Sequence, residues 1–207
     1  MSAKTSLSEL DLICKQAQEA KIDLRRSSKA KKNDALKYAA EFLLKNKAKL
    51  IDANTIDMEL ASQKDLQDSF VDRLELNEKR IDSMISGLDK VINLDDPVGQ
   101  TDQPHTSPSG FEVSKMRVPL GVIGIIYESR PNVTADASAL CLKSGNACIL
   151  RGGSEAANSN AVIEECMQDG LDKASLPKYS IQLIKNQDRK LVGEMIKREG
   201  DIDLLIP

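Results

Sequence analysis

The chain has 207 residues, 41% of them hydrophobic and 29% charged, and its formal net charge at pH 7 is −3. This composition is typical of a globular domain, and the acidic balance without a basic tract argues against nucleic acid as a partner. The longest apolar run, residues 119–127, is far shorter than the ~20 residues of a membrane-spanning helix. Charged residues interrupt the N-terminal segment from Lys4 onward, so the sequence predicts a cytoplasmic protein without a signal peptide.

The cysteines and the histidine do not form a metal-binding pattern. Cys14, Cys141, Cys148 and Cys166 include no CxxC pair, and each lies within an apolar pattern. This arrangement favours buried thiols in a reducing compartment over disulfides or metal ligands. The single histidine, His105, lies in a segment rich in Pro, Ser and Thr, where a solvated loop side chain is expected.

Three helices are predicted in the first 97 residues, because apolar side chains recur there at helical spacing. Ser8 is expected to cap the first helix, with Asp11 completing a capping box. The second begins near Lys29 and carries its apolar face as far as Leu50, and the third follows its cap, Asn77. Their opposite faces are charged, so we expect structural helices packed on a larger core.

The segment from Val98 to Arg117 is predicted to be a hairpin-like arm that leaves the main body. The sequence Asp95-Asp96-Pro97 ends the third helix, because proline cannot continue it. Proline and glycine then interrupt the chain, and residues 111–116 alternate apolar and polar side chains as a half-exposed strand does.

From Val118 onward, apolar strands alternate with helices. The predicted strands are 118–127, 147–150, 181–184 and 202–206. The helices between them cover 133–143, the region of 162–167 and the region of 191–196. Asp188 is the predicted cap of the last helix. This alternation predicts an α/β fold, with a Rossmann-like parallel sheet covered by helices on both faces.

Two glycines in the first of these strands, Gly121 and Gly124, suggest a dinucleotide fingerprint but do not form one. Both lie within the predicted strand, and no third glycine opens the following helix. We predict that they allow close approach of neighbouring chain within the sheet.

The turn after this strand, Glu128-Ser129-Arg130-Pro131-Asn132, is a stronger candidate for function. Pro131 suits the start of a helix, and it would hold Asn132 at the carboxyl end of a strand with its amide free to donate. Asn132 is then either a helix N-cap or a donor to an oxyanion, and the spacing does not decide between the two.

The turn after the next strand is Arg151-Gly152-Gly153-Ser154-Glu155. The two glycines would let a ligand approach the backbone, and the guanidinium and hydroxyl groups of Arg151 and Ser154 could both donate to a phosphate. A flexible turn with a solvated arginine is an equally good interpretation of the sequence.

Several runs of sequence resemble the gamma-glutamyl phosphate reductases of the aldehyde dehydrogenase superfamily. The longest are R-V-P-L-G-V-I-G-I-I-Y-E-S-R-P-N-V-T (117–134) and C-L-K-S-G-N-A-C-I-L-R-G-G-S-E (141–155). Shorter runs are V-D-R-L-E-L (71–76), N-L-D-D-P-V-G-Q (93–100) and I-D-L-L-I-P (202–207). They follow the order of that family and extend over nearly the whole chain.

The resemblance implies that NADPH reduces L-glutamyl 5-phosphate to L-glutamate 5-semialdehyde with release of phosphate, the second step of proline biosynthesis. It implies that Asn132 is the oxyanion-hole donor. It also implies that Arg151 and Ser154, with Gly152 and Gly153 between them, contact the adenosine ribose and 2′-phosphate of NADP. A hydroxyl in place of a carboxylate at position 154 suits NADP. Arg130 is the candidate for binding the phosphate or carboxylate of the substrate.

The resemblance further implies that the nucleophilic cysteine and the catalytic domain lie beyond the equivalent of Pro207. We therefore divide the chain into an N-terminal helical part (1–97), an oligomerisation arm (98–117) and a Rossmann-like NADP-binding part (118–207). The alternative function is a truncated, inactive fragment that binds the cofactor or other subunits. The implied partners are a second copy of the chain and glutamate 5-kinase. The kinase is expected to be a separate protein, because no kinase-like segment precedes residue 1.

Overall fold

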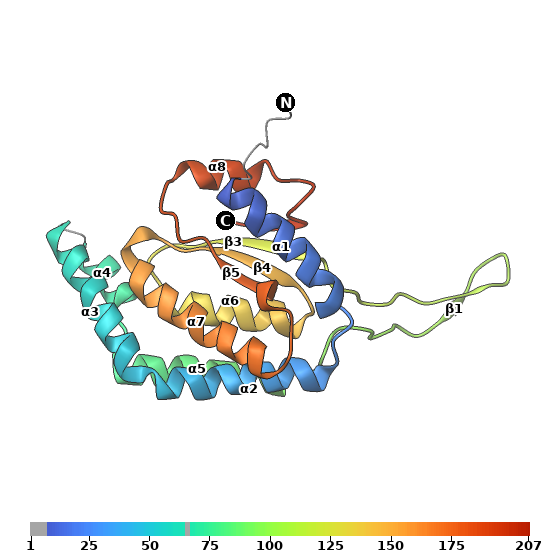
Figure 1. Cartoon of the computed structure of the whole chain (residues 1–207). Helices are drawn as coiled ribbons and strands as arrows, with labels where there is room; N and C mark the ends of the chain where they lie inside the picture. The colour runs from blue at the N-terminus through green and yellow to red at the C-terminus, as the bar shows by residue number, and fades with distance from the viewer. Residues whose placement is uncertain (1–7, 65–66) are drawn as a thin grey trace, which may run out of the picture.

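A parallel β-sheet forms the centre of the computed structural model, which describes residues 8–64 and 67–207 (Figure 1). Its strands, in chain order, are β3 (Val122–Ile126), β4 (Ala147–Arg151), β5 (Ile181–Leu183) and β6 (Leu204–Ile206). In space their order is β5-β4-β3-β6, and every neighbouring pair is parallel. The predicted α/β fold with a parallel sheet is therefore confirmed.

Helices cover both faces of this sheet (Figure 1). One face carries α1 (Glu9–Leu24) and α8 (Lys190–Ile196). The other carries α6 (Asn132–Lys143) and α7 (Ala157–Lys173), and α2 (Lys29–Lys45) and α5 (Glu78–Asn93) form an outer layer beneath them. The remaining helical elements are α3 (Lys47–Gln63), α4 (Asp68–Leu74) and the short 3₁₀ turns η1 (Ser154–Ala156) and η2 (Lys178–Ser180). In the described part of the chain, no helix combines the length and hydropathy needed to cross a membrane.

The alternation of side chains along the strands builds two hydrophobic cores. In β4, Cys148 and Leu150 belong to the larger core under α6 and α7, whereas Ala147 and Ile149 belong to the smaller core under α1 and α8. All four are fully buried. Strands buried on both faces must be apolar at every position, which is why this segment reads as a continuous apolar run.

The first and last N-terminal helices begin where the sequence predicted, but the number of helices differs from the prediction. Ser8 Oγ accepts from the Asp11 amide at 3.1 Å, and the Asp11 carboxylate accepts from the Ser8 amide at 2.9 Å, so the capping box is confirmed. Asn77 caps α5 as predicted. The single helix predicted from Lys29 to Leu50 is wrong: the chain leaves helical geometry at Asn46 (φ −97°, ψ 16°), which divides it into α2 and α3. Helix α4 was not predicted.

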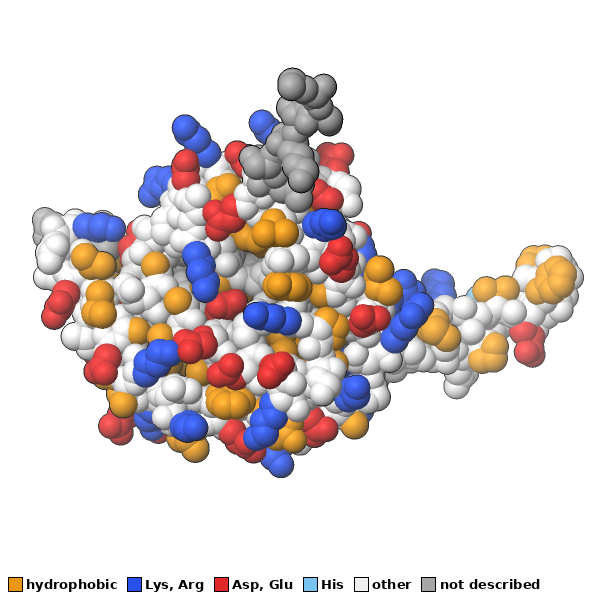
Figure 2. Space-filling view, in the orientation of Figure 1, with side chains coloured by type: hydrophobic (Ala, Val, Ile, Leu, Met, Phe, Trp, Pro, Cys, Tyr) orange, Lys and Arg blue, Asp and Glu red, His pale blue; other side chains and the backbone are white. Residues whose placement is uncertain are grey.

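The predicted arm is a two-stranded antiparallel hairpin that projects from the body (Figure 1). Its strands are β1 (His105–Thr106) and β2 (Glu112–Val113), and an isolated bridge joins Thr101 to Met116 nearer the body. His105, which was expected in a loop, therefore lies in a strand, with its side chain exposed. Figure 2 shows apolar side chains along this projection. Phe111, between the two strands of the arm, is exposed.

The two glycines near β3 have the packing role that was predicted, although the strand is shorter than expected. A Cβ on Gly124 would lie 2.7 Å from Cδ1 of Leu205, so glycine is needed for β6 and α8 to approach β3. Gly121 has φ +132°, which ends the strand on its N-terminal side, and a Cβ there would collide with the carboxylate of Asp203. The ladder therefore begins at Val122 and not at Val118.

Candidate functional site

The two polar turns lie side by side at the carboxyl edge of the sheet. Ile126 pairs with Arg151 in the ladder, the Tyr127 amide donates to the Arg151 carbonyl at 3.0 Å, and the Gly153 amide donates to the Glu128 carbonyl at 3.4 Å. The strand order reverses here, because β4 and β5 lie on one side of β3 and β6 lies on the other. Open α/β sheets bind ligands in the crevice at such a switch point.

Asn132 is the first residue of α6 and does not cap it. Pro131 occupies the N-cap position, and no side chain there accepts from the helix backbone. The interpretation of Asn132 as an N-cap is therefore wrong. The amide nitrogen Nδ2 donates to Oδ2 of Asp136 at 2.9 Å, so a neighbour one helical turn away orients the amide. The amide was expected to be free, but one of its two N–H groups is engaged by this bond.

Asn132 forms part of the wall of a cavity of about 360 Å³ between α4, α5 and the turn that precedes α6. Arg130 also lines this cavity, and its side chain is exposed. Burial raises the pKa of the Asp136 carboxyl, and the hydrogen bond from Asn132 partly opposes that rise. The lining residues are Asp72, Arg73, Glu75, Leu76, Arg80, Ser83, Met84, Arg130, Asn132 and Asp136.

Arg151 does not extend into solvent, so the alternative of a flexible turn with a solvated arginine is wrong. It is 6% exposed, and its guanidinium donates to the carbonyls of Gly152 and Gln187. The strand alternation directs this side chain to the α8 face, where the loop after β5 covers it. Its Nε is buried and has no hydrogen-bond partner among the described residues.

The glycines of this turn differ in role. A Cβ on Gly152 would collide with the Asn160 amide and lie 3.0 Å from the Tyr127 ring, so Gly152 serves packing within the protein and not the approach of a ligand. Gly153 is half-buried at the surface of a second cavity. Ser154 is exposed beside it, and its Oγ donates to Oε1 of Glu155 at 3.2 Å.

This second cavity, of about 360 Å³, lies where β3, β4 and β5 end. Sequence reasoning missed Arg189, which lines it from the loop between β5 and α8. Arg189 is exposed and forms no ion pair with the described residues. A signal was available, because Asn186-Gln187-Asp188-Arg189 follows a predicted parallel strand and therefore reaches the same edge of the sheet.

The predicted residues thus fall into two cavities. Arg130 and Asn132 line the first, whereas Arg151, Gly153 and Ser154 line the second, and the two sets of lining residues have no member in common. Asn132 and Arg151 therefore line no common cavity among the described residues. The turns touch through their backbones, while these predicted side chains line different cavities.

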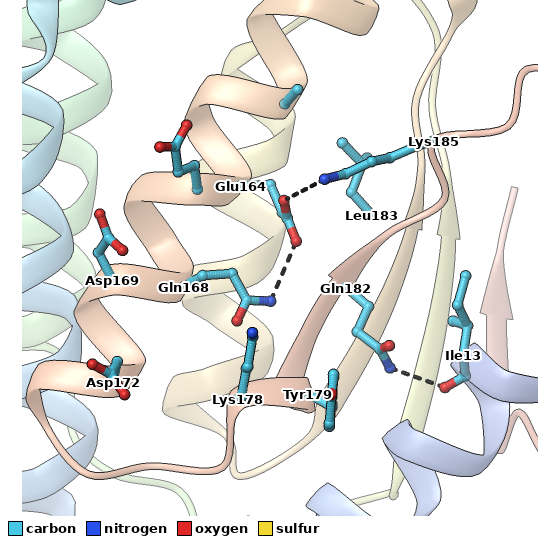
Figure 3. A pocket seen from close by; sticks show the side chains of 12 residues that line it. Ile13, Glu164, Gln168, Asp169, Asp172, Lys178, Tyr179, Gln182, Leu183 and Lys185 are labelled. Atoms are coloured by element: carbon cyan, nitrogen blue, oxygen red, sulfur yellow. Dashed lines mark hydrogen bonds and ion pairs between the residues drawn. The ribbon is translucent and has the colours of Figure 1, made fainter.

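A further cavity, of about 670 Å³, contains none of the predicted residues. It lies beside β5, and Figure 3 shows Glu164 between Gln168 and Lys185. Gln182 donates to the Ile13 carbonyl at 2.9 Å, and Glu164 lies 3.8 Å from Lys185 and accepts from Gln168 at 3.3 Å. We assign this cavity no ligand.

The four cysteines are free and buried, as predicted. Burial raises the pKa of both Cys14 and Cys166 to about 11. The hydrogen bond with the Cys141 thiol, together with burial, raises the pKa of Cys148 well above its usual value. Thiols of this kind are poor nucleophiles, because the reactive form is the thiolate.

The model of the aldehyde dehydrogenase family matches residues 2–206 of the chain. Among curated proteins, the chain is similar to a gamma-glutamyl phosphate reductase of Clostridium botulinum, with 47% identity over 97% of this chain and 49% of the relative. One from Caldanaerobacter subterraneus is 49% identical over 96% of this chain and 48% of its own length. The chain therefore spans about half the length of the curated relatives it matches.

Solved structures of this kind have the same fold. The gamma-glutamyl phosphate reductase of Thermotoga maritima superposes with a TM-score of 0.93 and 44% identity, over 97% of this chain and 48% of that one. The enzyme of the same name from Saccharomyces cerevisiae superposes with a TM-score of 0.89 and 32% identity, over 98% and 51% of the two chains.

Proposed function

The chain belongs to the aldehyde dehydrogenase family, and from that premise we propose that it forms the cofactor-binding half of a gamma-glutamyl phosphate reductase. The reaction is the NADPH-dependent reduction of L-glutamyl 5-phosphate to L-glutamate 5-semialdehyde, with release of phosphate, in proline biosynthesis. The observation that carries this proposal is the close match in sequence and fold to reductases of this name, combined with the polar turns at the carboxyl edge of the sheet.

The cofactor is assigned to the cavity at the ends of β3, β4 and β5. The exposed hydroxyl of Ser154 at this cavity suits a phosphate, and Arg151 lines the cavity with its guanidinium held by the carbonyls of Gly152 and Gln187. When bound, NADPH supplies the hydride. The chain's own groups bind the nucleotide and orient it across the switch point of the sheet.

The preference for NADP is assigned to Ser154 and Arg189. Ser154 places a hydroxyl at the rim, whereas a carboxylate at that position would repel a 2′-phosphate. Glu155 opposes this preference, because its carboxylate lies against the Ser154 hydroxyl. The exposed guanidinium of Arg189, in the neighbouring loop, offsets the effect of Glu155 by donating to the 2′-phosphate. Arg151 then supports the pocket from within.

Asn132 is proposed as the oxyanion donor. Its amide nitrogen has two N–H groups, of which Asp136 accepts one, and the other is available to a developing negative charge on the substrate. Arg130, two residues earlier on the same cavity wall, is proposed to bind an anionic group of the substrate. Both residues act by hydrogen bonding, so neither needs to change its protonation state.

The arm and the domain division complete the proposal. We assign residues 98–117 to contact with a second copy of the chain, since the exposed Phe111, Val113 and Met116 give the arm an apolar surface (Figure 2). Residues 1–97 support the cofactor-binding residues 118–207 by packing α2 and α5 beneath α6 and α7. Glutamate 5-kinase is the expected supplier of the acyl phosphate, and the free thiols favour a reducing, cytoplasmic environment.

A second function is favoured by the cysteines. Because all four thiols are buried, none is exposed to attack an acyl phosphate. Residues 1–207 alone would then bind cofactor or other subunits without catalysing reduction.

Fluorescence titration of residues 1–207 with NADPH tests the assignment of the cofactor. Binding should be saturable and should weaken in Arg189→Gln. A chain extended by the second half of a relative should reduce glutamyl phosphate, while residues 1–207 alone should not. No NADPH binding by either chain would overturn the proposal, and turnover by residues 1–207 alone would overturn the division of labour.

A further inference from the structure

We propose that Asp57, in α3, is a positioning residue for the cofactor. Its carboxylate occupies the N-terminus of α7, so the phosphate groups of the nucleotide are kept away from this helix end, and it holds in place the turn that carries Gly153 and Ser154. This inference rests on the proposed function and deepens it, because it adds a residue from outside the cavity to those that determine how the cofactor binds.

The N-terminus of α7 is a place where a nucleotide phosphate would be expected to bind. This helix follows β4 and a turn with two glycines. In dinucleotide-binding sheets, the helix after such a turn directs its free amides at the pyrophosphate. The N-cap residue of α7 is Ala156, whose side chain has no acceptor, so the first amides of the helix need a partner from elsewhere in the protein.

Asp57 supplies that partner. Its Oδ1 accepts from the backbone amide of Asn158 at 3.1 Å and from the Asn158 side chain at 2.8 Å. Its Oδ2 accepts from the backbone amide of Ser159 at 2.8 Å and from the Ser159 hydroxyl at 2.7 Å. The Asp57 side chain is fully buried. A nucleotide phosphate would therefore find these two amides already engaged and shielded from solvent.

The helix itself balances the charge of Asp57. All four donors are neutral groups, and the N-terminus of a helix carries roughly half a positive charge, which stabilises an anion there. Without such partners a buried charge would be strongly destabilising. Asp57 thus acts as a built-in anion at the position where a dinucleotide-binding sheet would otherwise bind phosphate.

Two contacts connect this arrangement to the turn before α7. Asn160 belongs to the same first turn of the helix and lies against Gly152, where a Cβ would come within 2.3 Å of the Asn160 side-chain nitrogen. Ala156 packs with Ala61 of α3, the helix that carries the carboxylate. The turn is therefore held on both sides, and residues 153–155 between these contacts lie at the cavity assigned to the cofactor.

Asp57→Ala tests the positioning role in residues 1–207. The variant leaves four donors without their acceptor, so the turn should loosen and NADPH should bind about tenfold more weakly in fluorescence titration. Gly170→Ala is the matched control, because it disturbs α7 near its other end, where the helix packs on α2. It should lower the melting temperature without changing NADPH affinity, when both variants are measured well below their melting temperatures.

Formate distinguishes a positioning role from a loss of stability. It has the size and charge of the group that Asp57→Ala lacks, so it should restore NADPH binding in this variant and leave Gly170→Ala unchanged. Formamide, which has a similar shape without the charge, should not restore binding. Asp57→Asn keeps the side-chain volume with only one acceptor oxygen, so its loss should be intermediate. This variant replaces Asp57→Ala if the alanine variant does not fold.

Hydrogen exchange tests the position of the turn without the nucleotide. The Gly153 amide donates to the Glu128 carbonyl at 3.4 Å, and the Ala156 amide donates to the Gly153 carbonyl at 3.2 Å. Both amides should exchange faster in Asp57→Ala, return to the original rate when formate is added, and stay unchanged in Gly170→Ala.

Nuclear magnetic resonance tests the exclusion of phosphate from α7. When NADPH is added to the unaltered chain, the amide signals of Gly153 and Ser154 should shift more than those of Asn158 and Ser159. The largest shifts at Asn158 and Ser159 would mean that the nucleotide binds at the helix end, and would overturn the inference.

The outcomes separate this inference from the proposed function. Equal NADPH affinity in Asp57→Ala and the unaltered chain, or equal losses in Asp57→Ala and Gly170→Ala, would overturn the role of Asp57 and leave the cofactor assignment standing. The expected exchange rates without NADPH binding to any chain would contradict the cofactor assignment and still support Asp57 as the residue that holds the turn. Unchanged exchange rates together with no NADPH binding would contradict both.

Discussion

The side-chain amide of Asn132 donates to the carboxylate of Asp136 at 2.9 Å, one turn further along α6. This bond explains how a residue at a helix start can present an amide without capping the helix. One N–H donates to Asp136, which fixes the orientation of the amide on the wall of the cavity. Under the proposed function the pair is a preorganised donor, which needs little reorganisation as charge develops on a substrate.

Asn132→Ala tests this role in a chain extended by the second half of a relative. Loss of one oxyanion donor should lower turnover by ~10²–10³, with little change in NADPH affinity. Turnover is measured by absorbance of NADPH and affinity by fluorescence. Loss of cofactor binding together with turnover would mean that Asn132 supports the fold instead.

Arg189→Gln and Arg151→Leu should have opposite signatures in residues 1–207. Arg189 is exposed, so its loss should weaken NADPH about tenfold, weaken NADH less, and leave the melting temperature unchanged. Arg151 is buried and donates to two carbonyls, so its loss should lower the melting temperature. Calorimetry and fluorescence titration give the two readouts. Equal effects of both variants on NADPH and on stability would contradict the division of roles.

Ser154→Glu should weaken NADPH far more than NADH. The new carboxylate would join Glu155 at the rim and repel the 2′-phosphate, which NADH lacks. Ser154→Gln is the matched control, because it adds similar bulk without charge. The ratio of the two dissociation constants in each variant is the measurement, and an unchanged ratio in Ser154→Glu would remove Ser154 from cofactor selection.

Asp136→Asn should raise the melting temperature at pH 7. The folded-state pKa of Asp136 is raised by burial, so the folded protein binds its proton more tightly than the unfolded chain does. Stability from this group is therefore lost as pH rises through the interval between the unfolded and folded pKa values. The variant should gain about 1–3 °C at pH 7, and the gain should vanish near pH 4. A gain that is independent of pH would contradict the assignment to this carboxyl.

Gly170→Ala should destabilise the protein, whereas Gly193→Ala should not. A Cβ on Gly170 would lie 2.6 Å from the Ala35 carbonyl oxygen and 2.8 Å from the Ala39 nitrogen, so α7 could no longer approach α2. We expect a loss of about 1–3 kcal/mol from this overpacking. Gly193 is in α8 with nothing within 4 Å of its Cβ position, so alanine there should add about 0.5–1 kcal/mol. Denaturant unfolding measures both, and a gain in stability for Gly170→Ala would contradict the packing argument.

Local chemistry determined much of this protein from the sequence alone. Ser8 with Asp11 and the cap Asn77 mark helix starts, because each satisfies backbone groups within a few residues of itself. The alternation of apolar strands and helices after Gly121 determined a parallel sheet, since strands buried on both faces must be apolar. The quoted motifs likewise determined the family.

Only the tertiary structure decided those features that depend on residues far away in the chain. The inward turn of Arg151 depends on the carbonyl of Gln187, which lies far away in the chain, and strand periodicity cannot predict which loop covers a residue at a strand end. The division into two cavities also became visible only in space, because adjacent turns can direct their side chains into different cavities. Short-range hydrogen bonds and periodicity are encoded locally, whereas burial and the partners of a charged group are set by how the layers pack.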